Sequence, residues 1–548
     1  MKNITANSII PNSSKSQITN NNKLSFSFRP IDAEEVSTYI NDLDKTKGPG
    51  IDQISNRIIK ESNNLITPHL TALFNRHIKE GTYPTNLKIA RCVPVYKGNN
   101  ADPYEPANYR PISILGGINK VLEKSLHSQM SHYLEDQKLL PGFQYGYRKG
   151  HNTQQAIAEF CNGIETNRNK NLVSIAVFMD LSKAFDTVNK ELLLNKLKNL
   201  GFNQISTNLI NNYMTDRHFC FKNKTDEVYC LKHGVPQGSV LGPLLFLVYI
   251  HDMKNICKDI TKIVYADDTT LIITGRTKEE ATNNCNIVLD IFYKYFTYNK
   301  LTINENKTKY MVYNSNRRTH KTNCIKNITM NNVILEEVKN IKFLGIIINN
   351  KLNWSDHKLH IKTKICKSIG ILYNCRKILK HNDLLSMYRT FVEPFFLYCL
   401  PIWGSAITPN TGILCKIQNK TLRILFECRR TADAWLATNN KILRLEQLYS
   451  HETAKLCFKH HTNSLPLYFS ETVMPTTPEN DNIPHYHLRN NTIKQYNYQV
   501  DQKYNQSFTN NCITTWNNLP DNLKKMTYNN MTYQQFKLQS KKELLGIS

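Results

Sequence analysis

The 548-residue sequence lacks the features that mark a membrane or secreted protein. Its most apolar runs, Leu241–Ile250 and Val392–Trp403, are shorter than the roughly 20 residues that a helix needs to cross a bilayer. The first 22 residues are polar and rich in Asn and Ser, with no apolar stretch, so we expect no signal peptide. Because they also contain no arginine, a transit peptide is not expected either.

The sequence also lacks a clear zinc motif, because none of its 14 cysteines forms a CxxC pair. Cys457 and His460 form a CxxH pair, with His451 and His461 nearby. Structural zinc sites use about four ligands, usually in two close pairs, and no second pair follows. We therefore favour reduced, mostly buried thiols and a structural role for this CxxH pair over a zinc site.

Acidic residues are scarce relative to basic ones. The chain has 44 Asp and Glu against 70 Lys and Arg, a formal net charge of +26. With 40% hydrophobic residues it can bury a sizeable core, which excludes a disordered or fibrous chain. The positive charge predicts a polyanionic partner, and the short apolar runs favour nucleic acid over a membrane surface.

Local patterns predict a mixed α and β fold. Ala90–Tyr96 is typical of a strand, and Pro94 inside it favours an edge position. Val173–Met179 is predicted to be a largely buried strand that ends on Asp180. A helix with an apolar face follows and stops at Gly201. From about residue 350 to 430 the pattern is mostly helical.

Two β-rich runs flank a pair of aspartates. Ile263–Tyr265 and Thr269–Ile273 are separated by Ala266, Asp267 and Asp268, which predicts a hairpin with carboxylates at its tip. Carboxylates gathered at strand ends can hold two divalent cations about 4 Å apart, an arrangement that stabilises in-line displacement at phosphorus. An Asp-Asp pair taken alone is more typical of a solvated turn, so the surrounding motifs decide between the two interpretations.

Six ordered motifs resemble those of reverse transcriptases, in particular the jockey-like group of non-LTR (LINE-type) retrotransposons. A set of ordered motifs is far more specific than any one of them. The motifs are NYRPISIL at 108–115, QYGYR at 144–148, FMDLSKAFD at 178–186, GVPQGSVLGP at 234–243, YADD at 265–268 and KFLG at 342–345.

This resemblance implies an α+β right-hand polymerase of fingers, palm and thumb, with an antiparallel palm sheet and a mostly helical C-terminal region. The expected divisions are a disordered tail at 1–25, fingers and an N-terminal extension at 26–165, the palm at 166–350, a helical thumb at 351–430, and a region of unclear role at 431–548. Weaker similarity extends beyond residue 350, as far as Trp516–Pro520.

The resemblance also implies site residues. Asp180, Asp267 and Asp268 would be the catalytic metal ligands, with Asp268 the weakest. Phe185 would exclude an incoming 2′-hydroxyl, although the local sequence equally allows a core phenylalanine. Gln237 would contact the nucleotide, with Gly238 providing space and Ser239 capping the helix Val240–Ile250.

The expected basic and primer-binding positions follow in the same way. Lys97 and Arg110 would face the triphosphate, and Lys307 could protonate pyrophosphate. Phe343, Leu344 and Gly345 would hold the primer end through a tight hairpin. A basic helical stretch from Lys358 to Lys380 would follow the duplex, with a solvated helix face as the alternative. Aromatic residues through 486–508 could stack on bases, although we favour packing.

The implied cofactor is a pair of Mg²⁺ ions, with Mn²⁺ as a possible substitute, and the implied partners are RNA template, DNA primer, RNA–DNA duplex and dNTPs. Nuclear and cytoplasmic localisation follows from the family, while the oligomeric state stays open. We expect no upstream endonuclease, CCHC knuckle or RNase H segment within this sequence. The alternatives are a group II intron-type or telomerase-like reverse transcriptase, and a nucleic-acid-binding relic without catalysis.

Overall fold

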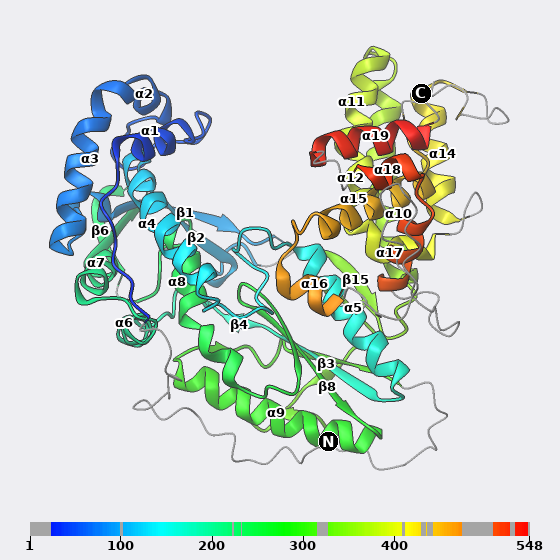
Figure 1. Ribbon diagram of the computed structural model, residues 1–548, viewed down its shortest axis with the longest axis horizontal. Coiled ribbons are helices and arrows are strands. Elements are labelled where there is room, and N and C mark those ends of the chain that lie inside the picture. The colour runs from blue at the N-terminus through cyan, green and yellow to red at the C-terminus, as the bar shows by residue number, and fades with distance from the viewer. Residues whose placement is uncertain are drawn as a thin grey trace, which may run out of the picture.

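The computed structural model describes residues 24–98, 102–221, 224–231, 233–314, 327–407, 412–428, 435, 442–473, 508–526 and 532–545 (Figure 1). The N-terminal helices and the C-terminal helices lie on opposite sides of the central strands β3 and β8 (Figure 1). Most of the expected tail and most of the aromatic stretch 486–508 lie outside the described residues.

Four helices build the N-terminal side. Asp32 begins the first of them with a capping box, in which its side chain accepts from the Glu35 backbone N–H while Glu35 reaches back to Asp32. Gly81 ends the third in the left-handed conformation, with φ +67°. The helices are α1 (Ala33–Asn41), α2 (Asn56–Glu61), α3 (Asn63–Glu80) and α4 (Gly117–Asp136).

A four-stranded sheet next to these helices has the order β2-β1-β5-β6. Its strands are β1 (Ile89–Tyr96), β2 (Tyr109–Ile114), β5 (Arg217–Phe221) and β6 (Lys224–Leu231). The edge position predicted for β1 is wrong, because β1 pairs with both β2 and β5. Pro94 is tolerated there because β5 pairs only with Ile89–Cys92, so the proline lies where β1 has a single partner.

A five-stranded central sheet has the order β13-β10-β3-β8-β7. Its four longer strands pair antiparallel, and only the two-residue β13 pairs parallel. The predicted buried strand is confirmed as β3, since every residue of Val173–Met179 is buried. The strands are β3 (Val173–Met179), β7 (Thr261–Tyr265), β8 (Asp268–Gly275), β10 (Lys309–Tyr313) and β13 (Glu336–Glu337).

Of the helices between residues 153 and 298, the first and the last pack against the central sheet. The predicted stop at Gly201 is confirmed, and the helix expected at Val240–Ile250 is found one residue shorter at each end. These helices are α5 (Thr153–Asn169), α6 (Lys190–Asn199), α7 (Gln204–Met214), α8 (Leu241–Tyr249) and α9 (Lys278–Tyr298). Three short two-stranded sheets complete this part: β4 (Leu181–Ser182) with β9 (Thr302–Ile303), β11 (Thr329–Met330) with β12 (Val333–Ile334), and β14 (Asn340–Phe343) with β15 (Ile346–Asn349).

Beyond β15 the described residues are helical, as expected for the C-terminal region. The helices are α10 (Ser355–Cys375), α11 (His381–Phe391), α12 (Glu393–Leu397), α13 (Leu400–Trp403), α14 (Ile413–Leu425), α15 (Leu445–His461), α16 (Leu467–Val473), α17 (Phe508–Asn517), α18 (Asp521–Lys525) and α19 (Tyr533–Leu545). Among the described residues, no helix is both long and apolar enough to span a bilayer.

Candidate active site

Three aspartates from distant parts of the sequence meet at one end of the central sheet. The β7–β8 hairpin turns through Ala266 and Asp267, and Tyr265 pairs with Asp268 across it. Strand β3 lies beside β8 with Met179 opposite Thr269. Continuing this register by one residue places Asp180 opposite Asp268. Residues directly opposite in antiparallel strands have Cβ atoms about 5 Å apart, so the carboxylates are brought together.

A buried glutamine holds the tip of this hairpin. The Gln144 Oε1 accepts from the backbone N–H groups of Ala266, at 2.9 Å, and of Gly146, at 2.8 Å. Its Nε2 donates to the Ala266 carbonyl oxygen at 3.3 Å. Ala266 has φ +60°, a left-handed conformation that costs a non-glycine residue about 1–2 kcal/mol, so the turn needs this support. A Cβ on Gly146 would lie 2.3 Å from the Ala266 nitrogen, so only glycine allows the approach. The QYGYR motif was part of the family resemblance, but the sequence analysis gave Gln144 and Gly146 no role.

The pKa values of the cluster reflect burial first and the crowding of like charges second. Loss of hydration is the main cause that raises the pKa of Asp268 to about 6, and the negative charges of Asp267 and Asp180 add to it. The side chain still has access to solvent. Burial also raises the pKa of Asp267; the Asp180 charge adds to this rise, and the Arg110 guanidinium opposes it. The site therefore concentrates negative charge that a cation would neutralise.

The aspartate cluster fits a hard divalent cation in its chemistry. It offers carboxylate oxygens, the ligands that Mg²⁺ prefers. Within the part of the chain that the structure describes, no three His, Cys, Asp or Glu side chains are already gathered into a metal site. The aspartates therefore form a converging carboxylate cluster and not a preformed ligand cage.

Two of the predicted basic residues lie at this cluster. Lys307 Nζ is 3.8 Å from Asp180 Oδ2. The turn that carries Lys307 is fixed next to β3, because Asn304 donates its backbone N–H to the Asp180 carbonyl oxygen and accepts from that of Lys307. Arg110, exposed on β2, is near enough to influence Asp267. Lys97 is also exposed and donates to the Ala107 carbonyl oxygen at 2.6 Å.

Phe185 packs beside the cluster. Its ring lies 4.8 Å from that of Phe246 and 6.1 Å, edge to face, from that of Tyr147. Burial raises the pKa of Tyr147, and the negative charge of Asp267 raises it further. Tyr147 therefore lies near the aspartates. Phe185 is therefore a half-buried residue between the core helix α8 and the carboxylate cluster.

Gln237 is held by a residue that the sequence analysis missed. Its Nε2 donates to Asp186 Oδ1 at 2.8 Å. Because a carboxylate oxygen only accepts, this bond fixes which way the amide faces. The motifs that contain the two residues are also joined through their backbones, since Val235 N–H donates to the Phe185 carbonyl oxygen at 2.9 Å. Asp186 was part of a quoted motif, but nothing in the sequence identified its partner.

Gly238 has a structural reason for its small size. Its φ is +103°, and a Cβ there would lie 2.7 Å from the Ser113 carbonyl oxygen of β2. The backbone of β2 therefore occupies the space beside Gly238. The predicted contact of this residue with a nucleotide stays a prediction. Ser239 Oγ accepts from Gly242 N–H at 3.0 Å as expected of a cap, while the buried Glu123 accepts from the N–H groups of Val240 and Leu241.

The expected primer-grip segment is the tip of the β14–β15 hairpin. Leu344 and Gly345 form the two-residue turn, both with positive φ. The Tyr398 hydroxyl donates to the Leu344 carbonyl oxygen at 2.5 Å. Phe343 is buried, with its ring 5.3 Å from that of Phe160 and 5.6 Å from that of Phe178. Only the tip residues are therefore placed to contact a ligand.

The basic stretch expected along the duplex lies on α10 and the turn after it. Lys364, Lys367, Lys377 and Lys380 are exposed. Lys358, by contrast, donates to the Ala406 carbonyl oxygen at 3.2 Å, and the Arg376 guanidinium lies over the Tyr373 ring. These four lysines present their charges at the surface, while Lys358 and Arg376 have partners within the protein.

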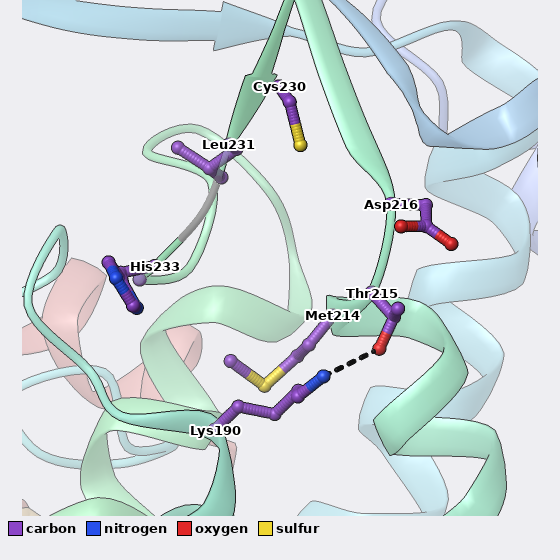
Figure 2. A pocket seen from close by; sticks show the side chains of 8 residues that line it. Lys190, Met214, Thr215, Asp216, Cys230, Leu231 and His233 are labelled. Atoms are coloured by element: carbon purple, nitrogen blue, oxygen red, sulfur yellow. Dashed lines mark hydrogen bonds between the residues drawn. The ribbon is translucent and has the colours of Figure 1, made fainter.

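A cavity of about 230 Å³ has none of the three clustered aspartates in its lining (Figure 2). Lys190, at the start of α6, donates to the Thr215 hydroxyl across its floor. Asp216, Cys230 and His233 also line it. None of the residues expected in the active site is among its lining residues, so it is separate from the carboxylate cluster.

The CxxH pair lies in the C-terminal helices. Cys457 Sγ donates to the Cys512 carbonyl oxygen at 3.4 Å, which joins α15 to α17. His461 stacks on Trp516 at 4.2 Å. These contacts are those of packed core side chains.

Comparison with known proteins finds reverse transcriptases among the similar proteins. Residues 96–348 match the family described as reverse transcriptase (RNA-dependent DNA polymerase). The chain is 27% identical over 421 residues to a probable RNA-directed DNA polymerase from transposon BS of Drosophila melanogaster, covering 74% of this chain and 46% of that protein. Two other D. melanogaster proteins are similar: the probable RNA-directed DNA polymerase from transposon X-element, 26% identical over 76% of this chain and 45% of its own length, and the RNA-directed DNA polymerase from mobile element jockey, 26% identical over 73% and 44%.

The chain spans a little under half the length of these relatives. The matched family segment contains all three aspartates, Gln237 and the β14–β15 tip. The resemblance to jockey-like polymerases that the motifs indicated is thereby confirmed. Residues 96–348 therefore resemble a reverse transcriptase domain, and the similar proteins include the RNA-directed DNA polymerase from mobile element jockey.

Proposed function

We propose that this protein is an RNA-directed DNA polymerase of a non-LTR retrotransposon, which extends a DNA 3′-end on an RNA template. The observation that carries the proposal is the meeting of Asp180, from the end of β3, with Asp267 and Asp268, from the β7–β8 tip. Strand ends hold these carboxylates in place, and a two-metal nucleotidyl transfer requires such a set.

The arrangement supports a right-hand architecture. We assign the palm to residues 166–350, which contain the central sheet, and the fingers and an N-terminal extension to 26–165. The hairpin β5–β6 joins the fingers sheet through β1 although it follows the first palm strand in sequence. The thumb is assigned to 351–430, where α10 carries the exposed lysines.

Asp180, Asp267 and Asp268 would hold two Mg²⁺ ions, for which Mn²⁺ could substitute. Bound there, such a pair lowers the pKa of the primer 3′-hydroxyl and neutralises charge on the departing pyrophosphate. Arg110 would grip the triphosphate, assisted by Lys97, because a guanidinium binds phosphate oxygens bidentately. Lys307, whose Nζ lies 3.8 Å from Asp180 Oδ2, would donate a proton to the leaving pyrophosphate oxygen.

The remaining residues would select the nucleotide and hold the strands. Phe185, backed by Phe246, would close the space beside the sugar C2′ so that a ribonucleotide clashes. Gln237, oriented by Asp186, would contact the nucleotide. Leu344 and Gly345 would hold the primer end. The exposed lysines on α10 and on the turn after it would contact duplex phosphates in a salt-dependent way. Action on genomic DNA in the nucleus, after synthesis in the cytoplasm, follows from this function.

The test is extension of an oligo(dT) primer on poly(rA) with dTTP and Mg²⁺. We expect wild-type protein to synthesise DNA and Asp267→Ala to lose about a thousandfold or more of the rate, because a metal ligand is removed. Asp290→Ala is the matched control, since Asp290 is an exposed α9 residue paired only with Lys294 among the described residues. Primer–template affinity should stay within about twofold in both variants.

Two outcomes would count against the proposal. Undiminished synthesis by Asp267→Ala would refute the metal-ligand assignment. A wild-type protein that binds primer–template without extending it would favour the catalytically silent relic.

A further inference from the structure

Helix α5 joins the central sheet to the last helices of the chain. One face of α5 carries Glu159, Asn162 and Glu165, spaced three residues apart. Each of them meets a residue from beyond position 465: the Tyr468 hydroxyl donates to Glu159 Oε1 at 2.9 Å, and Thr509 Oγ1 lies 3.4 Å from Asn162 Oδ1. The Phe508 backbone N–H donates to Glu165. The C-terminal helices are therefore attached to the body of the domain by polar contacts.

Glu159 is also bonded to the loop that supports the active site. The Tyr145 hydroxyl donates to Glu159 Oε2 at 2.6 Å. Glu159 is 5% exposed and Tyr145 1%. A buried carboxylate needs donors for its oxygens, and here the two tyrosines provide one for each. Loss of either hydroxyl leaves one oxygen of Glu159 without this bond.

From Tyr145 the contacts continue directly to the catalytic hairpin. Tyr145 N–H donates to the Val264 carbonyl oxygen at 2.7 Å, and Val264 N–H donates to the Phe143 carbonyl oxygen at 2.9 Å. Gln144, between Phe143 and Tyr145, forms hydrogen bonds with both the N–H and the carbonyl oxygen of Ala266. The segment 143–145 thus bonds to Glu159 through Tyr145 and to the aspartate-bearing turn through Gln144.

Helix α16 also touches the beginning of this segment. A Cβ on Gly142 would lie 2.4 Å from the Tyr468 ring, so the ring rests on the glycine backbone. Tyr468 therefore makes two contacts with the support of the catalytic hairpin: its ring packs on Gly142, and its hydroxyl reaches Tyr145 through Glu159. Figure 1 shows α16 beside α5, next to the central strands.

We propose that α16 is a positioning element of the active site, in which Tyr468 and Glu159 act through Tyr145 to hold the catalytic hairpin. The inference rests on the proposed polymerase function for its consequence, but the coupling itself is a property of the fold. It gives part of the region beyond residue 430 a role in setting the geometry of Asp267 and Asp268, separate from contact with nucleic acid.

The variant that tests the coupling is Tyr468→Phe, which removes one oxygen and keeps the ring on Gly142. Tyr449→Phe is the matched control, because Tyr449 is a half-buried tyrosine of α15 whose ring packs on Gly404. Hydrogen exchange would be followed in peptides covering 143–147 and 264–268. We expect Tyr468→Phe to speed exchange there by about fivefold to tenfold, because a hydrogen bond to the buried Glu159 is lost, and Tyr449→Phe to leave it unchanged.

Steady-state primer extension provides the second readout. Tyr468→Phe should lower kcat by about fivefold to tenfold with KM for primer–template unchanged, because strand binding is not altered. In a Tyr145→Phe background the same substitution should have no further effect, since both hydroxyls act through Glu159.

Exchange that speeds up only within 467–473, or equally in Tyr449→Phe, would overturn the proposal. So would additive effects of Tyr468→Phe and Tyr145→Phe. The exchange measurement needs no polymerase activity, so a failure of the coupling is distinguishable from a failure of the proposed function.

Discussion

Two tight hairpins carry residues that we propose for the active site, and they differ in how their tips are held. The catalytic hairpin β7–β8 turns through Ala266 and Asp267, and the grip hairpin β14–β15 turns through Leu344 and Gly345. In each, a non-glycine residue at the first turn position has positive φ, +60° for Ala266 and +43° for Leu344. In each, a side chain from elsewhere in the sequence bonds that residue's backbone.

The supports are unequal. Gln144 is buried and makes three hydrogen bonds at the catalytic tip, two of them to Ala266. Tyr398 is 40% exposed and donates a single hydrogen bond to Leu344, while its hydroxyl also lies 3.2 Å from Thr153 Oγ1 at the start of α5. The tip that carries the proposed metal ligands is therefore fixed from within the core, whereas the tip expected to hold the primer is held at the surface.

Replacing Gly146 or Gly345 with alanine should give the largest difference in activity and stability between the two hairpins. A methyl group on Gly146 would meet the Ala266 backbone nitrogen at 2.3 Å, which cannot move without moving the turn. Gly146→Ala should therefore cost about 3 kcal/mol or more in the free energy of unfolding and abolish primer extension. At Gly345 the nearest atoms belong to the Tyr398 side chain, so Gly345→Ala should cost only about 1–2 kcal/mol, from its positive φ. Equal losses in denaturant unfolding would refute the difference.

Removing the supporting side chains should lower activity less than the change at Gly146 does. Gln144→Ala leaves the buried N–H groups of Ala266 and Gly146 without this acceptor, and we expect a loss of about 3 kcal/mol and a fall in kcat of about 100-fold. Tyr398→Phe loses one hydrogen bond at an exposed site, worth about 1 kcal/mol, and should lower kcat less than about tenfold. A kcat for Tyr398→Phe as low as that for Gln144→Ala would show that the grip hairpin is equally constrained.

Much of the site could be predicted from the sequence because its parts are locally encoded. The buried strand before Asp180 and the hairpin around Asp267 each follow from a few consecutive residues, and so does the helix after Ser239. Their order along the chain then indicated that they belong to one site. The interpretation of Pro94 failed because the local rule does not show that a neighbouring strand can stop short of the proline.

The supporting contacts could not be predicted in this way. Gln144 lies 122 residues from Ala266, and Glu159 lies 309 residues from Tyr468. A buried polar residue whose partner is distant leaves no periodic or spacing signal in a single sequence. Asp186 shows the same limit, because its role depends on Gln237, 51 residues away.

The most direct test of the central claim, that Asp180 and the Asp267–Asp268 pair hold divalent cations together, is iron-dependent cleavage of the protein backbone. Fe²⁺ bound in place of Mg²⁺ and treated with ascorbate and peroxide generates hydroxyl radicals that cut nearby peptide bonds. We predict cuts near residue 180 and near residues 265–268 in the same molecule, suppressed by excess Mg²⁺ and absent in Asp267→Ala. Cleavage at only one of these segments, or at neither, would contradict a shared metal site.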